Sequence, residues 1–95
     1  MKEPAIYITT NKPNGTLYIG VKNNLVQRVY QHKQSMFDGF TKKYCCHNLV
    51  YYELHSDMYS AITREKLLKK YTRARKIKLI LQNNPQWQDL YNTII

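Results

Sequence analysis

Residues 5–22 read AIYITTNKPNGTLYIGVK, and this stretch decides the fold. Apolar side chains alternate with polar or aromatic ones on both sides of a segment rich in turn-forming residues, a pattern that predicts a β-hairpin. If Thr10 pairs with Gly15, the apolar residues of the two strands face one another, and Tyr7 faces Tyr18. A slip of one residue would break both matches. The hairpin therefore predicts one apolar face for the core and an opposite face that carries the two tyrosines.

The rest of the chain predicts mainly helices, with one further strand. Asn23 or Asn24 is a candidate cap for the first helix, and Ser56 or Asp57 for the second. A run of β-forming residues after position 48 predicts the third strand. We expect these elements at about residues 24–35 (helix), 49–54 (strand), 58–82 (helix with a break near Thr72) and 87–91 (short helix). A chain of 95 residues is enough for one domain with a modest core.

The charge of the chain points to a polyanionic partner. Fifteen Lys and Arg residues against six Asp and Glu give a net charge of +9. Basic surfaces attract polyanions by releasing counterions, so nucleic acid is the leading partner, and a merely soluble basic protein is the alternative. Eight of the fifteen basic residues lie in residues 64–78, among apolar residues that favour a folded helical face. The basic residues that we expect to bind phosphate are Lys22, Lys66, Lys69, Lys70, Arg73, Arg75 and Lys76.

The sequence shows no sign of a membrane protein or of an oxidised, secreted one. The N-terminal residues do not have the form of a signal peptide, and no apolar run approaches the roughly 20 residues that span a bilayer. Cys45 and Cys46 are neighbours that rarely meet disulfide geometry, so we expect reduced thiols in a cytoplasmic protein. With His47 they form a weak metal-site alternative, because a second ligand pair and the usual zinc spacing are missing.

Glu65 stands out because it lies in the most basic part of the chain and on the apolar side of its predicted helix. Ala61, Ile62 and Leu68 lie three or four residues away and share that side. An ionised carboxylate is costly to bury alone, so a buried Glu65 must meet a cation, a metal ion or a hydrogen-bond network. The alternatives are a structural pair with a core arginine and a place at the edge of the basic face.

Four further side chains could carry chemistry. Arg28 and His32 are four residues apart and share one side of the first helix. An arginine can clamp a phosphate, and a histidine can exchange a proton near neutral pH. Tyr7 or Tyr18 becomes a useful base only if nearby cations or a metal lower its pKa well below about 10. The alternatives are that Arg28 and His32 form a solvated basic flank of the helix, and that the tyrosines serve ordinary packing.

Taken together, these residues and the stretches around them resemble the GIY-YIG nuclease domain, in particular its small stand-alone bacterial branch of URI type. The matching stretches are Ala5-Ile6-Tyr7, Tyr18-Ile19-Gly20-Val21, Leu25 with Arg28 and His32, Phe40-Thr41-Lys42-Lys43-Tyr44, Leu49-Val50-Tyr51-Tyr52-Glu53, Ala61-Ile62-Thr63-Arg64-Glu65-Lys66 and Asn84-Pro85-Gln86-Trp87-Gln88-Asp89-Leu90. Each is weak alone, but their order and spacing are specific. The chain departs from the family at Ala5, where glycine is usual, and at Val21, where lysine is frequent; Lys22 follows it on the Tyr18 side of the strand.

The resemblance implies an α+β fold, a three-stranded antiparallel sheet flanked by helices, in a single domain over residues 1–95. It also implies an endonuclease that hydrolyses DNA with one divalent ion, Mg²⁺ or Mn²⁺. By this resemblance, Tyr7 and Tyr18 would activate or position the attacking water. Arg28 would hold the phosphate, and His32 would accept a proton. Glu65 would bind the metal, and Gly20 would keep the backbone small. With only six acidic residues, of which Glu53 is the other candidate ligand, the composition favours one metal over two. Asn83 and Asn84 both stay open as the late asparagine of the family.

Three functions stay open on the sequence alone. The first is a metal-dependent DNA endonuclease with little sequence specificity, since no helix-turn-helix or zinc finger accompanies it. We expect it to be a monomer that acts on duplex or branched DNA in DNA repair, without a small-molecule cofactor. The second is a nucleic-acid-binding module with weak or no catalysis, in which Glu65 is structural. The third is an adaptor that uses the aromatic residues Phe37, Phe40 and Tyr44 as a protein contact.

Overall fold

The computed structural model describes residues 3–34 and 45–95. Its elements in chain order are β1 (Ala5–Thr10), β2 (Leu17–Lys22), α1 (Leu25–Lys33), β3 (Asn48–Leu54), α3 (Met58–Lys69), α4 (Arg73–Asn83) and α5 (Tyr91–Ile94). The expected helix end near Ser35 and the adaptor residues Phe37, Phe40 and Tyr44 fall outside the described residues. Elsewhere the expected elements are present, and the break expected near Thr72 separates α3 from α4. The short terminal helix, expected at about residues 87–91, is displaced and spans Tyr91–Ile94.

The three strands form one antiparallel sheet in the order β2-β1-β3. This confirms the α+β fold predicted from the sequence. β1 lies in the centre, and all six of its residues are buried. β2 and β3 are the edge strands, and the pairing of β3 with β1 is irregular where Ile8 lies opposite Tyr51 but Thr9 lies opposite Leu49. Val50 is the extra residue of this bulge.

The predicted register of the hairpin is wrong by two residues. Thr10 pairs with Leu17 rather than Gly15, and Tyr7 lies opposite Gly20. Because side chains alternate along a strand, a shift of two residues keeps every side chain on its predicted face. The apolar face and the tyrosine face are therefore both present, with different partners across the strands.

The longer loop explains the shift. The Asn11 side chain accepts a hydrogen bond from the backbone N–H of Thr16 at 3.0 Å, and the N–H of Gly15 donates to the Lys12 carbonyl at 2.9 Å. Asn14 adopts the left-handed backbone conformation, with φ of 57°, that asparagine tolerates better than most residues. These local bonds draw Gly15 and Thr16 into the loop and start β2 at Leu17.

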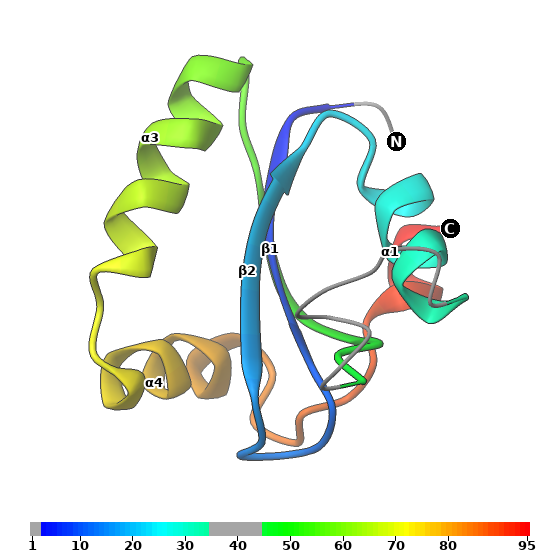
Figure 1. Ribbon diagram of the computed structural model, residues 1–95, viewed down its shortest axis with the longest axis vertical. Coiled ribbons are helices and arrows are strands. Elements are labelled where there is room, and N and C mark those ends of the chain that lie inside the picture. Colours follow the sequence, from blue (N-terminus) through cyan, green and yellow to red (C-terminus); the bar gives the residue numbers. More distant parts are fainter. Residues whose placement is uncertain (1–2, 35–44) are drawn as a thin grey trace.

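The helices lie on both sides of the sheet, as Figure 1 shows: α3 and α4 on one side, α1 and α5 on the other. The side of α3 and α4 encloses a core that includes Ile6, Ile8, Ile19, Val50, Ala61, Leu68 and Ile80. The other side encloses a second group of buried residues, Ala5, Tyr7, Leu25, Val29, Leu49 and Ile94. The tyrosine face of the hairpin therefore lies under α1.

The segment after α4 returns to β3 and α1. The backbone N–H of Leu90 donates to the Leu49 carbonyl at 2.7 Å. The Asp89 carboxylate accepts from the N–H of Leu49 at 3.2 Å and of Tyr91 at 3.1 Å, and it also pairs with Lys33 at the end of α1. The C-terminal segment thus covers part of the β3 edge and anchors α1 against the sheet.

Three helices begin at side-chain caps. Asn24, Asp57 and Thr72 each accept a hydrogen bond from the backbone N–H three residues ahead, at 3.1, 2.7 and 3.2 Å. Among the residues that the structure describes, no helix combines the length and the apolar character needed to span a membrane.

Candidate active site

Tyr7, Tyr18 and His32 come together on the α1 side of the sheet. Tyr7 from β1 is 1% exposed and His32 from α1 is 3% exposed, whereas Tyr18 from β2 is half-buried. The ring centroids are 6.3 Å apart for the two tyrosines, 5.7 Å for Tyr7 and His32, and 5.6 Å for Tyr18 and His32. We refer to these three side chains as the Tyr–His cluster. The sequence placed the three together by family resemblance, and the fold brings them together.

The cluster holds a neutral acid beside a neutral base. Burial raises the pKa of Tyr7 above its ordinary value, and Tyr18 adds to this, while Arg28 opposes it. Burial also lowers the pKa of His32 to about 4, with Arg28 and His47 contributing. The Tyr7 hydroxyl lies 3.1 Å from Nε2 of His32. When the neutral imidazole carries its proton on Nδ1, its Nε2 accepts the hydrogen of the Tyr7 hydroxyl.

This result separates the roles of the two side chains. The sequence left open that Arg28, Lys22 and a metal might lower a tyrosine pKa enough to make a base. In the chain itself burial dominates at Tyr7, and its pKa moves upward. His32, in contrast, stays unprotonated well below neutral pH. His32 is therefore the side chain of this cluster with a basic nitrogen at physiological pH. His47 was not predicted to act on it, and no sequence pattern relates the two positions.

Gly20 makes room for the Tyr7 ring. The two residues are cross-strand partners, and a Cβ atom at Gly20 would overlap the Tyr7 hydroxyl and lie 2.9 Å from its Cε1. The resemblance suggested that this glycine keeps the backbone small for the substrate. The structure gives it a different partner, because the Tyr7 side chain itself fills the space above Gly20. Any larger residue here has to displace the ring that bonds His32.

Arg28 lies on the same helix as His32, one turn earlier, and is half-buried. Its charge acts on both Tyr7 and His32, since it lowers the pKa of each. A guanidinium beside a buried base is the placement that a phosphate clamp requires, because Arg can bond two oxygens of one phosphate.

Glu65 lies on α3, in the other layer of helices, and its charge acts on this cluster. Its negative charge is one of the causes that raise the pKa of Tyr7. The Glu65 side chain is only 14% exposed, and its Oε2 lies 3.5 Å from Nζ of Lys69, which is 55% exposed. The carboxylate is therefore largely sheltered and acts electrostatically on Tyr7. Its partner at the surface is the ammonium of a flexible lysine side chain.

Glu53, the second candidate carboxylate, belongs to a different group. Nε and Nη2 of Arg64 donate to it at 3.1 and 3.0 Å, Tyr51 donates its hydroxyl, and Nε2 of His55 lies 3.3 Å away. Although burial raises the pKa of Glu53, the hydrogen bonds from Arg64 and Tyr51 bring it below its ordinary value. We call these four side chains the Glu53 network. A carboxylate with three protein partners is a structural ion pair.

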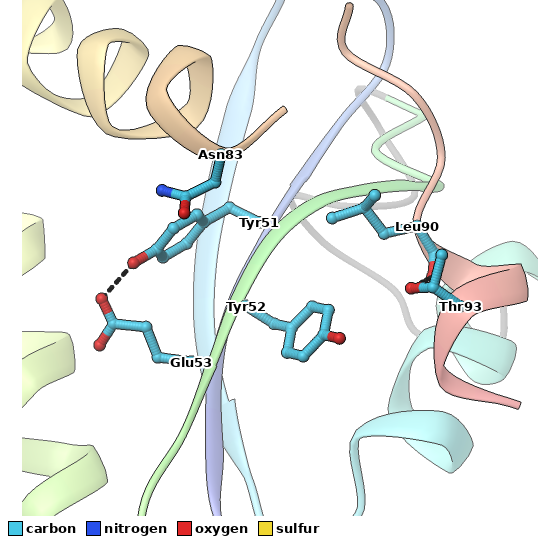
Figure 2. A pocket seen from close by; sticks show the side chains of 6 residues that line it. All are labelled: Tyr51, Tyr52, Glu53, Asn83, Leu90 and Thr93. Atoms are coloured by element: carbon cyan, nitrogen blue, oxygen red, sulfur yellow. Dashed lines mark hydrogen bonds between the residues drawn. The ribbon is translucent and has the colours of Figure 1, made fainter. Parts of the chain in front are cut away.

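A hollow of about 470 Å³ lies at β3 beside this network (Figure 2). Its lining residues are Tyr51, Tyr52, Glu53, Asn83, Leu90 and Thr93. Asn84 is buried, and its side chain donates to the carbonyls of Val50 and Gln88 at 3.1 and 2.8 Å and accepts from the N–H of Gln88 at 3.0 Å. Asn84 is thus a clamp for the C-terminal segment, and Asn83 lies at this hollow rather than in the Tyr–His cluster.

The predicted phosphate-binding residues lie on β2, α3, the turn after it and α4. Those that are exposed are Lys66, Lys69, Lys70, Arg73 and Arg75, and those that are half-buried are Lys22 and Lys76. Two of the arginines also have structural partners. Arg73 Nη2 donates to the carbonyls of Asn14 and Gly15 at 2.6 Å each, and the Arg75 guanidinium lies 3.8 Å from the centroid of the Tyr71 ring. These contacts hold α4 against the hairpin loop and stack Arg75 on Tyr71.

The Glu65 carboxylate is a suitable ligand for a single divalent ion. Mg²⁺ in nucleic-acid enzymes is usually held by one or two carboxylates, and waters and substrate phosphate complete its shell. Glu65 supplies one such carboxylate, sheltered from solvent. Within residues 3–34 and 45–95, no three His, Cys, Asp or Glu side chains gather in one place. Cys46 is buried and Cys45 exposed.

Known proteins and a known domain family share sequence with this chain. The sequence model of the GIY-YIG catalytic domain matches residues 3–78. Two similar proteins, the UPF0213 proteins of Staphylococcus aureus strains Mu3 and Mu50, are each 34% identical over 67 residues, which is 70% of this chain and 82% of theirs. No solved structure matches the chain. The match spans both motif tyrosines, the α1 pair and Glu65. The chain therefore belongs to the GIY-YIG family of nuclease domains.

Proposed function

We propose that the chain is a divalent-metal-dependent endonuclease that hydrolyses phosphodiester bonds in DNA. The observation that carries the proposal is the Tyr7–His32 contact, a 3.1 Å hydrogen bond between a buried phenol and a buried imidazole. The imidazole has a pKa of about 4 and so is free of its second proton when it is needed as a base. An arginine whose charge acts on both rings stands beside them.

The two rings form a path for one proton. Tyr7 donates its hydroxyl hydrogen to Nε2 of His32, which leaves the phenol oxygen able to accept a hydrogen bond from a water molecule. As that water attacks phosphorus, its proton passes to the Tyr7 oxygen and the Tyr7 proton passes to His32. Arg28 holds the phosphate oxygens during the attack. Tyr18, half-buried beside both rings, orients the water.

Glu65 would hold the ion, Mg²⁺ or Mn²⁺. When bound there, the ion supplies positive charge that stabilises the oxygen that leaves phosphorus. The remaining task of the chain is to hold the polyanion. A net charge of +9 and the basic residues of α3 and α4 supply the attraction, which depends on salt and not on sequence.

The substrate we propose is duplex or branched DNA, cut with little sequence preference. The expectations of a monomer, of a cytoplasmic location and of a role in DNA repair belong to the same proposal. Gel filtration with light scattering tests the first of them, with a particle of 11.4 kDa as the expected result.

The test is a cleavage assay on supercoiled plasmid and on labelled duplex and branched oligonucleotides. Wild-type protein should nick or cut with Mg²⁺ or Mn²⁺ and not with EDTA. Glu65→Gln should reduce the rate by about three orders of magnitude, because the loss of the ion removes several kcal/mol of transition-state stabilisation. Glu53→Gln is the matched control and should keep cleavage. Salt-dependent binding without cleavage under either ion would select the nucleic-acid-binding module instead.

A further inference from the structure

A pocket of about 290 Å³ lies at the edge of β2, next to the Tyr–His cluster. It is lined by Leu17, Tyr18, Ile19, Lys69 and Lys76. Successive side chains of a strand point to opposite faces, so a pocket lined by three successive β2 residues lies at the strand edge rather than on one face. β2 is an edge strand of the sheet. Lys69 comes from α3 and Lys76 from α4.

Two residues join this pocket to the candidate active site. Tyr18 lines the pocket and lies 5.6 Å, ring to ring, from His32. Lys69 lines the pocket and lies 3.5 Å from the Glu65 carboxylate. The pocket is therefore adjacent both to the proposed proton path and to the proposed ion ligand, and two lysine side chains line it beside aliphatic and aromatic residues. A phosphate with its sugar has the matching chemistry: an anion and an apolar ring.

We propose that Lys69 and Lys76 form a subsite for a phosphate next to the one that is cut, and that Lys69 is shared between this subsite and Glu65. The inference rests on the proposed function. Without an ion, Lys69 serves as the counter-ion of Glu65. A divalent cation bound by Glu65 would neutralise the carboxylate and weaken its attraction for Lys69. The Lys69 ammonium would then be available to the phosphate beside Lys76. Ion and nucleic acid then favour each other's binding through one side chain.

The structure makes the exchange easy. Lys69 is 55% exposed, and its ammonium ends a flexible four-carbon chain. An exposed pair between residues four apart on a helix is weak, so breaking it has a small cost. Glu65 is more sheltered, with 14% of its side chain exposed, so a cation beside it is worth more than one on the open surface.

The subsite is tested first by DNA binding in EDTA, where no cleavage occurs. Lys76→Met is compared with Lys78→Met, which removes the same charge from the same helix outside the pocket. Fluorescence anisotropy with a labelled DNA duplex should show an affinity loss of about fivefold or more for Lys76→Met and less than about twofold for Lys78→Met. Equal losses would overturn the subsite, because the effect would be one of net charge alone.

The sharing of Lys69 is tested by a double-mutant cycle in the same assay. Glu65→Gln should strengthen metal-free DNA binding by about two- to threefold, because Lys69 is released to the subsite. In a Lys69→Met background that gain should vanish, whereas in a Lys66→Met background, which removes an exposed charge of the same helix, it should persist. A gain that persists with Lys69→Met would overturn the sharing.

Mn²⁺ binding without DNA gives the independent readout. Electron paramagnetic resonance should show Mn²⁺ bound about twofold more tightly by Lys69→Met than by wild type, and unchanged in Lys66→Met. Equal changes in both variants would contradict the proposal. These outcomes can be told apart from failure of the proposed function. If Lys76→Met binds DNA more weakly than Lys78→Met but the wild type does not cleave with Mg²⁺ or Mn²⁺, the nuclease is rejected and the subsite is kept. If the wild type cleaves but the two variants bind DNA equally well, the subsite is rejected and the nuclease is kept.

Discussion

Two buried tyrosines on neighbouring strands have opposite surroundings. Tyr7 is 1% exposed and Tyr51 is 6% exposed, and burial raises the pKa of both hydroxyls. Tyr51 donates to Glu53, a carboxylate that Arg64 and other partners already neutralise. Tyr7 instead bonds His32, a neutral base whose pKa is lowered to about 4.

The difference teaches how one sheet separates structure from chemistry. In the Glu53 network every proton has one favourable place, because a carboxylate with a lowered pKa and an arginine resist any transfer. In the Tyr–His cluster both partners are neutral, and the raised pKa of Tyr7 and the lowered pKa of His32 keep the shared proton on the phenol. In the proposed reaction that proton passes to the imidazole only as the phenol oxygen takes another from water, so no phenolate is left behind.

The largest effect is expected for His32→Gln. Loss of the proton acceptor should slow DNA cleavage by about 10²- to 10⁴-fold while DNA binding stays within about twofold. His55→Gln, in the Glu53 network, should leave the cleavage rate within about twofold. Single-turnover cleavage and anisotropy give both quantities. A similar rate loss in the two variants would remove the distinction between the two regions.

Gly20→Ala should have the next largest effect on DNA cleavage. The added methyl group overlaps the Tyr7 side chain, so the ring must leave Nε2 of His32. We expect cleavage to fall by about 10-fold or more and the free energy of unfolding to fall by about 1–3 kcal/mol. Val21→Ala, on the opposite face of β2, is the control: it should lower stability by a similar amount and keep cleavage. Wild-type cleavage by folded Gly20→Ala protein would show that the Tyr7–His32 contact is dispensable.

The pH dependence follows from the lowered pKa of His32. The fold favours the neutral ring, so the unfolded chain, with a pKa near 6.5, takes up the proton first. This contribution to stability is therefore complete above about pH 6.5 and is lost as pH falls toward about 4, by on the order of 2–3 kcal/mol. Denaturant unfolding at several pH values should show this slope in wild type and a shallower one in His32→Gln. The acid limb of kcat/KM should lie near pH 4; a limb at 6.5 would contradict the account.

The smallest effect on activity is expected for Tyr51→Phe. It removes one hydrogen bond to Glu53 and should cost about 1 kcal/mol of stability, while cleavage stays within about twofold. Tyr7→Phe removes the corresponding bond to His32 and should slow cleavage by about 10-fold or more. Thermal unfolding and cleavage rates of the two variants check the pair. Equal rates for both would mean that the Tyr7 hydroxyl has no part in the reaction.

The faces of the sheet could be predicted from the sequence, whereas the pairing could not. Alternation along residues 5–22 places Ile6, Ile8 and Ile19 in one layer and both motif tyrosines in the other, because alternation is a property of the strand alone. The register depends on the loop, where an Asn11 side-chain bond to Thr16 lengthens the turn by two residues. Hydrogen bonds of this kind leave no trace in hydrophobic periodicity.

The candidate site shows the same division. Spacing of four residues along a helix puts Arg28 and His32 on one side, and the structure agrees. The direction of the Tyr7 pKa could not be predicted, because it depends on how completely the surrounding fold buries the ring. The engagement of Glu53 by Arg64 depends on a contact between β3 and α3, which no local pattern contains.

In the proposed reaction the Glu65 carboxylate, whose charge acts on Tyr7 of the Tyr–His cluster, holds a divalent ion. The most direct test is an NMR titration with Mn²⁺, which broadens the signals of nearby nuclei, while the ring resonances of His32 and His55 are followed. His32 should broaden first in wild type, and this broadening should disappear in Glu65→Gln. Broadening of His55 before His32, or His32 broadening that survives Glu65→Gln, would show that the ion binds elsewhere.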